Sequence, residues 1–110
     1  MSGYNLIPVY TGELMRLDDM LTRAGIPHET REDATMGGAN IKVPTLEAWT
    51  RWRRPCISVI QYRTSYGGQE GKLELWAHGP RSDNGPVGWL TAEQAFDMIA
   101  QVFPGVEVTA

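Results

Sequence analysis

Two strand-forming stretches joined by a glycine-rich connection limit the fold more than any other part of this chain. Residues 57–62 are rich in β-branched and aromatic side chains, a composition that favours a central strand. Residues 72–78 alternate between apolar and polar side chains, as a strand with one buried face does. Residues 65–71, which join them, contain three glycines and predict a hairpin turn. The two stretches therefore predict an antiparallel pair at the centre of the fold.

The alternation in the second stretch assigns its side chains to two faces. We expect Leu73, Leu75 and Ala77 to face the core, which turns Trp76 and His78 toward the polar face. A tryptophan on a polar face needs cover from a loop, a partner subunit or a ligand. Within the chain, the loop that follows this strand and the N-terminal segment are the alternative covers.

An amphipathic helix is predicted before the sheet, over residues 12–24. Thr11 is placed to cap it, and Gly25 stands where a left-handed residue ends a helix. Pro27 disfavours any continuation beyond that point. The apolar residues that repeat along one helical face are Leu14, Leu17 and Leu21.

A second helix is predicted to begin at Thr91. This residue and Gln94 match a capping box, in which each side chain accepts from the other residue's backbone N–H. Pro104 and Gly105 end the helix. Its apolar stripe consists of Ala95, Phe96, Ile99 and Phe103.

The segment between the first helix and the hairpin gives weaker strand signals. Residues 27–33 predict a short polar strand. Residues 41–49 predict another strand, which Pro44 restricts to a sheet edge or forces into a bulge. The residues expected to break the chain between these strands are Gly37, Gly38 and Asn40.

The order of these elements predicts the fold class. We expect residues 1–12 to be extended, residues 79–86 to form a polar loop, and residues 106–108 to add a last strand. A length of 110 residues suits one core. The prediction is a single α+β domain, residues 1–110: a small antiparallel sheet of three to five strands, flanked on one face by an N-terminal and a C-terminal helix.

Composition excludes several classes of protein. The chain contains no run of about 18 apolar residues, so no transmembrane helix is expected. Its N-terminus lacks the basic and apolar regions of a secretory signal. Cys56 is the one cysteine, which excludes an internal disulfide and indicates a reducing cytosol. The histidine and cysteine spacings match no metal motif, so we expect neither a metal nor a cofactor.

Charge is distributed unevenly along the chain. No acid lies between Glu47 and Glu70, a stretch that carries four arginines, whereas the whole chain has a net charge of −3. The stretch is therefore +4 and the remainder −7. Because the whole molecule is acidic, we expect no stable nucleic-acid binding. Trp49, Trp52, Tyr62 and Tyr66 are interleaved with Arg51, Arg53, Arg54 and Arg63.

Arginine beside aromatic rings favours a site for a base with phosphates. We expect the arginines to neutralise phosphate, a ring to stack on the base, and Ser65 with the hairpin amides to donate hydrogen bonds. These groups would gather around one anion-binding hollow. The candidate ligand-binding residues are Trp52, Arg53, Arg54, Arg63, Ser65, Tyr66, Gly67, Gly68 and Trp76.

Structural explanations of the same residues stay open. The arginines also suit a solvated turn that tryptophans anchor to the core. The glycines suit a hairpin that needs positive φ angles. Tryptophan and arginine are also frequent hot-spot residues of protein interfaces.

Catalytic arrangements are weak. Cys56, His28 and His78 are the residues able to supply a thiolate or a base. A lone cysteine at the start of a strand is more often a small buried residue. We therefore expect no catalytic residue and no enzyme; a hydrolase, the alternative, would depend on His78.

Three motifs in order resemble those of small bacteriophage and prophage proteins. They are Ser58-Val-Ile-Gln-Tyr-Arg-Thr-Ser-Tyr-Gly67, Gly71-Lys-Leu-Glu-Leu75 and Gly88-Trp-Leu-Thr-Ala-Glu93. The first helix, which ends near Gly25-Ile-Pro27, is similar to theirs. The resemblance covers about three quarters of the chain and implies an accessory protein that acts in the cytoplasm of an infected bacterium.

The resemblance implies a counter-defence role, for which two functions are expected. The first is a homo-oligomeric sponge that sequesters a small anionic nucleotide signal of host immunity. The alternative is a protein–protein inhibitor of a host defence nuclease or effector, as anti-CRISPR proteins are. A virion or replication accessory protein without a small ligand is the remaining possibility.

Overall fold

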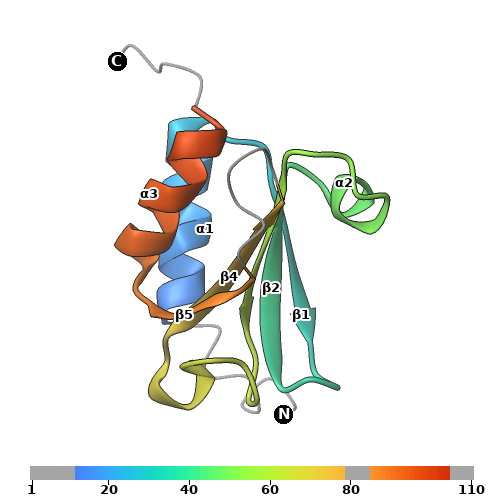
Figure 1. Cartoon of the computed structure of the whole chain (residues 1–110). Coiled ribbons are helices and arrows are strands. Elements are labelled where there is room, and N and C mark those ends of the chain that lie inside the picture. Colours follow the sequence, from blue (N-terminus) through green and yellow to red (C-terminus); the bar gives the residue numbers. More distant parts are fainter. Residues whose placement is uncertain (1–11, 79–84, 105–110) are drawn as a thin grey trace.

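The fold is an antiparallel meander of five strands with two helices on one face (Figure 1). The computed structural model describes residues 12–78 and 85–104. Neighbouring strands along the chain are neighbours in the sheet, in the order β1-β2-β3-β4-β5. The strands are β1 (Glu29–Asp33), β2 (Gly38–Val43), β3 (Cys56–Gln61), β4 (Leu73–His78) and β5 (Val87–Leu90). The helices are α1 (Glu13–Ala24), α2 (Leu46–Thr50) and α3 (Ala92–Val102), with a 3₁₀ turn, η3 (Gly68–Glu70).

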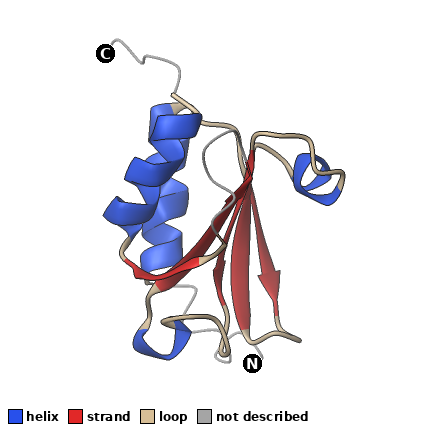
Figure 2. Cartoon of the chain, in the orientation of Figure 1, coloured by secondary structure: helices blue, strands red, loops and turns tan. Residues whose placement is uncertain are grey.

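The core lies between the sheet and the paired helices α1 and α3 (Figure 2). Leu14, Leu17 and Leu21 are fully buried on α1, as their spacing predicts. They meet the inward side chains of β2, β3 and β4 and those of α3. This arrangement confirms the α+β class with helices at both ends of the chain. Among the described residues, no helix is long and apolar enough to cross a membrane.

Helix ends follow local chemistry. Gly25 adopts a left-handed φ of 72°, and Ile26 donates its N–H to the Leu21 carbonyl over 3.0 Å. The capping box is confirmed: the Gln94 N–H donates to Thr91 Oγ1 (3.2 Å), and the Thr91 N–H donates to Gln94 Oε1 (2.9 Å). Each helix therefore begins or ends at a residue that satisfies exposed backbone groups.

The start of α1 depends on a residue far away in sequence. Thr11, the predicted cap, lies outside the described residues, and Gly12 is the N-cap without a side-chain bond. Instead, the buried Gln61 of β3 accepts the Leu14 N–H at its Oε1 atom over 3.2 Å. Glu13 in turn accepts the Ala92 N–H over 2.7 Å and so links α1 to α3.

The predicted strand over residues 41–49 is wrong in its bounds and its place. The strand, β2, ends at Val43 and lies inside the sheet between β1 and β3, so Pro44 follows it rather than interrupting it. Thr45 then caps α2, accepting the Ala48 N–H at Oγ1 over 3.0 Å. A capping threonine followed by Leu46, Glu47 and Ala48, which all favour helix, explains why the chain turns into α2 here.

The strands also extend where glycines predicted a break. The turn occurs at Gly37, whose φ is 76°, whereas Gly38 and Asn40 belong to β2. A Cβ at Gly38 would lie 1.9 Å from the Gln61 carbonyl, so this glycine allows two strands to approach. β5 was not predicted, because it is four residues long and carries a glycine. The predicted extended residues 1–11, the loop residues 79–84 and the strand 106–108 lie outside the described residues.

Candidate functional site

The face of the sheet opposite α1 and α3 carries most of the exposed aromatic rings. Leu73, Leu75 and Ala77 point into the core, so Trp76 and His78 of β4 point to the helix-free face, as predicted. Among the described residues, the large aromatic side chains that remain exposed are Trp52 (56%), Tyr66 (53%), Trp76 (39%) and Trp89 (59%). They form two groups, one beside α2 and one beside the hairpin.

The first group, here called the tryptophan cluster, consists of Trp49, Trp52, Trp76 and His78. The rings of Trp49 and Trp52 stack with centroids 6.2 Å apart, and the edge of Trp49 meets Trp76 at 6.0 Å. His78 lies beneath them, with its ring 4.1 Å from that of Trp52. Trp49 of α2 therefore covers part of Trp76, whereas the loop after β4 and the N-terminal segment, the two predicted covers, lie outside the described residues.

Local structure holds Trp52 in this cluster at a cost. α2 ends in a turn in which the Arg53 N–H donates to the Ala48 carbonyl over 2.8 Å. Trp52 has a φ of 54°, a left-handed value that is unfavourable for a bulky residue. Contacts with Trp49 and His78 maintain it while more than half of the side chain stays exposed. Strain of this kind often marks a binding position.

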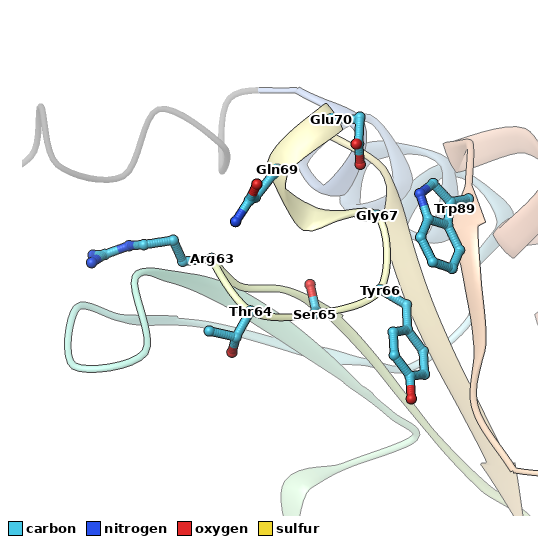
Figure 3. Close-up of a pocket in the computed structure, with 8 residues that line it drawn as sticks. All are labelled: Arg63, Thr64, Ser65, Tyr66, Gly67, Gln69, Glu70 and Trp89. Atoms are coloured by element: carbon cyan, nitrogen blue, oxygen red, sulfur yellow. The ribbon is translucent and has the colours of Figure 1, made fainter.

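The second group lies at the β3–β4 connection and borders a shallow hollow of about 220 Å³ (Figure 3). Tyr66 and Trp89 stack with centroids 5.8 Å apart and planes inclined by 7°. Figure 3 shows Arg63 extending away from this pair, on the other side of the hollow. The hollow is lined by Arg63, Thr64, Ser65, Tyr66, Gly67, Gln69, Glu70 and Trp89.

Some of the predicted hydrogen-bond donors of the hairpin are used inside the turn. Ser65 Oγ accepts the Tyr62 N–H over 3.0 Å and donates to the Tyr62 carbonyl over 2.9 Å. The Gly68 N–H donates to the Ser65 carbonyl over 2.9 Å. Gly67 has a φ of 89° and packs against the backbone of Trp89. The predicted role of Ser65 and the Gly68 amide as anion donors is therefore corrected: both stabilise the turn.

The nine predicted residues do not gather around one hollow. Arg53 and Arg54 precede β3, whereas Arg63 follows it, and a strand of six residues spans roughly 17 Å between its ends. Trp52, Arg53, Arg54 and Trp76 belong to the α2 end; Arg63, Ser65, Tyr66, Gly67 and Gly68 belong to the hairpin end. The expectation of a single hollow is wrong, because the two halves of the basic stretch flank the central strand.

Sequence reasoning did not identify Lys42, which is the most unusual charged residue of the described structure. It lies on β2 on the helix-free face and is only 8% exposed. Its Nζ donates to Asn40 Oδ1 (3.0 Å) and Ser58 Oγ (2.9 Å). Burial, with the nearby Arg31 as a second cause, lowers the pKa of Lys42 to about 8. The signal in the sequence was a lysine alternating with apolar residues in a strand that proves to be interior.

Residues considered for catalysis occupy structural positions. Cys56 and His78 are cross-strand partners on β3 and β4, and both are buried. His28 lies apart from them, with its Nε2 2.7 Å from Asp18 Oδ1. Within residues 12–78 and 85–104, no group of three His, Cys, Asp or Glu side chains is placed to hold a metal.

Comparison with known proteins does not place this chain in a family. No family model matches it, and no curated protein and no solved structure shows significant similarity to it.

Proposed function

We propose that this chain is a non-catalytic binding protein whose partner is another protein, bound on the helix-free face of the sheet. The observation that carries this proposal is the exposure of Trp52 and Trp76 in one packed cluster. Large apolar rings that remain exposed together on a small domain are typical of interaction surfaces. Tryptophan is also among the residues that contribute most to binding energy at protein interfaces.

The surroundings of the cluster favour a partner with an acidic surface. Arg53 is exposed next to Trp52, and Arg51, on the other side of Trp52, is exposed and forms an ion pair with Glu47 (3.5 Å). Arginine beside tryptophan adds charge complementarity to apolar contact. The hollow described at the hairpin is shallow, which suits a broad contact better than the deep burial that small ligands require.

The biological setting follows from the resemblance to bacteriophage proteins. The proposed partner is a host defence nuclease or effector, blocked in the cytoplasm of an infected bacterium. The phage motifs at residues 58–67, 71–75 and 88–93 support this setting. Two of these motifs supply exposed rings, Tyr66 and Trp89.

Affinity capture with matched variants tests the proposal. The purified chain would be incubated with bacterial lysate, and a stoichiometric partner identified, purified and titrated by calorimetry. We expect Trp52→Ala to weaken its binding about tenfold or more, the effect of a hot-spot residue. Met15→Ala is the control, because Met15 is equally exposed but lies on α1, on the opposite face. A partner whose affinity is unchanged by Trp52→Ala, or the absence of any partner, would contradict the proposal.

A second candidate function is capture of a small nucleotide-type anion at the hairpin hollow, and the Tyr66–Trp89 pair favours it. A centroid separation of 5.8 Å leaves no room for a base between the rings, since two stacking distances need about 7 Å. A base would instead stack on an outer ring face, with Arg63 available for phosphate across the hollow. Glu70, which lines the same hollow, repels a ligand that carries several negative charges.

Calorimetry against cyclic and ADP-ribose-type nucleotides tests this second candidate. Binding should weaken about tenfold in Trp89→Ala and in Arg63→Gln, and remain unchanged in Arg53→Gln at the other end of β3. If no nucleotide releases heat or raises the melting temperature, the sponge proposal fails. Light scattering on the same samples tests the predicted homo-oligomer.

A further inference from the structure

Lys42 stands out because it is a buried cation with no ionic partner in the described part of the chain. Its side chain lies on the interior strand β2, covered by Trp49, whose ring centroid is 5.8 Å from Nζ. No carboxylate of the described residues comes within ion-pair distance of Nζ, although Glu29 lies opposite Lys42 on β1. A buried charge normally has a partner of opposite sign, so this lysine is costly as a purely structural residue.

The two hydrogen bonds of Lys42 can be made by the neutral amine as well as by the ammonium. A neutral amine has two N–H groups and one lone pair, and two acceptors lie within 3.0 Å of Nζ: Asn40 Oδ1 and Ser58 Oγ. Asn40 is itself fixed, because its Nδ2 donates to the Tyr62 hydroxyl over 2.8 Å. With both N–H groups engaged, the lone pair is the group that remains available for reaction.

Burial and nearby charges also favour the neutral form of Lys42. Burial and the Arg31 charge lower the pKa of Lys42 to about 8, while Asp33 opposes them weakly. Glu29 is the other charged residue that β1 places on this face. At pH 7.5 roughly a quarter of such an amine is neutral, against about one in a thousand for an unperturbed lysine. Desolvation and a neighbouring cation are the usual means of activating a lysine nucleophile.

Lys42 opens onto a hollow of about 440 Å³ at the β1 side of the sheet. Arg31 and Lys42 supply its positive charges, and Glu32 and Asp33 balance them, so a singly charged ligand fits better than a phosphate-rich one. We propose that Lys42 is a nucleophilic amine that captures a small aldehyde or ketone bearing one carboxylate, which Arg31 receives. This site adjoins the tryptophan cluster through Trp49, but it shares no lining residue with the hairpin hollow.

The proposed step is imine formation. The Nζ lone pair adds to the carbonyl carbon, and the carbonyl oxygen takes up a proton to give a carbinolamine. Loss of the remaining N–H proton and of the hydroxyl as water then leaves a C=N bond. The balance is one amine and one carbonyl compound in, one imine and one water out, with no oxidant or reductant.

Reductive trapping with glyoxylate tests the proposal. The folded full chain would be incubated with glyoxylate and cyanoborohydride at pH 7.5, and the modified peptides quantified by mass spectrometry. Lys72 is the internal control, because it is the only other lysine. We expect Lys42 to be modified about tenfold faster than Lys72, and expect this preference to disappear in 8 M urea, where the fold that activates the amine is lost.

Two variants and acetaldehyde, an aldehyde without a carboxylate, give further tests of the proposal. Lys42→Arg should abolish trapping on that peptide, and acetaldehyde should react more slowly than glyoxylate if Arg31 receives the carboxylate. Ser58→Ala should reduce the rate, because it removes one of the two acceptors that orient the amine. Modification of Lys72 at an equal or higher rate than Lys42 in the folded wild type would overturn the proposal, whether or not the variants fold.

Discussion

Of the buried polar residues on the strands, Lys42 and Gln61 have the longest side chains apart from His78 and use them differently. Gln61 is fully buried and accepts the Leu14 N–H in the first turn of α1, so its polar group acts as a helix cap does. Lys42 meets two neutral oxygens and no anion among the described residues. Gln61 offsets part of the cost of its burial through this bond, although its buried Nε2 has no hydrogen-bond partner among the described residues, whereas Lys42 retains the desolvation cost of a charge.

Replacing Lys42 by a residue of similar length and no charge tests this cost. We expect Lys42→Met to raise the free energy of unfolding by about 1 kcal/mol at pH 7, because the desolvation penalty exceeds two hydrogen bonds to neutral groups. Urea denaturation followed by tryptophan fluorescence measures it. A loss of more than about 1 kcal/mol would instead assign Lys42 a structural role.

The lowered pKa of Lys42 also predicts that the stability difference between the wild type and Lys42→Met depends on pH. Lys42 has a pKa of about 8 in the fold and about 10.5 when unfolded, so the folded state releases its proton first. Between pH 8 and 10.5 the free energy of unfolding of the wild type therefore rises with pH relative to that of Lys42→Met. Below pH 8 both states of the wild type carry the charge, and the cost of burying it is fully present. The pKa of Tyr62 is raised by burial, which lowers stability at high pH in both proteins and cancels in the difference. A pH-independent difference would contradict this assignment.

At the scale of elements, the β3–β4 hairpin depends on close packing rather than on an open glycine loop. η3 folds back on the end of β3, and the turn encloses the Ser65 hydroxyl. A Cβ at Gly68 would lie 1.9 Å from the Tyr62 carbonyl. At Gly71 the nearest atom would be 3.9 Å away, and only its φ of 76° restricts substitution.

These two glycines give a matched pair of substitutions. Gly68→Ala should destabilise the chain by about 2 kcal/mol or more, because backbone atoms must move to admit the methyl group. Gly71→Asn should cost less than about 1 kcal/mol, since asparagine tolerates the left-handed region. Thermal unfolding of the two variants and the wild type measures both losses of stability. Equal losses would mean that the hairpin lacks the close contact described here.

At the scale of the molecule, the meander places the two exposed aromatic groups at opposite ends of one face. The tryptophan cluster is held by α2 before β3, and the Tyr66–Trp89 pair by the turn after it. No residue belongs to both groups. They can therefore contribute to one broad interface, but they cannot enclose one small ligand.

This separation predicts additive binding effects. For the partner captured in the experiment above, the losses from Trp52→Ala and Trp89→Ala should sum in the double variant to within about 0.5 kcal/mol. Calorimetry on the four proteins of the cycle measures the coupling. A coupling well above that value would show that the two groups act as one site.

Periodicity and end signals in the sequence determined the central strand, both long helices and the α+β class. Leu14, Leu17 and Leu21 repeat on one face, Thr91 and Gln94 cap each other, and Gly25 ends α1. Each of these signals acts between residues that are close in sequence, so its effect does not depend on which other elements pack nearby.

Tertiary structure alone decided how the functional residues are distributed. Closeness in sequence suggested that Arg53, Arg54 and Arg63 share a site, yet β3 separates them by its own length. Lys42 gained its burial, its partners and its lowered pKa from β3 and from the fold of α2 over it. Spacing along a chain fixes which face of a strand a side chain occupies, whereas burial depends on neighbours that pairing brings from elsewhere.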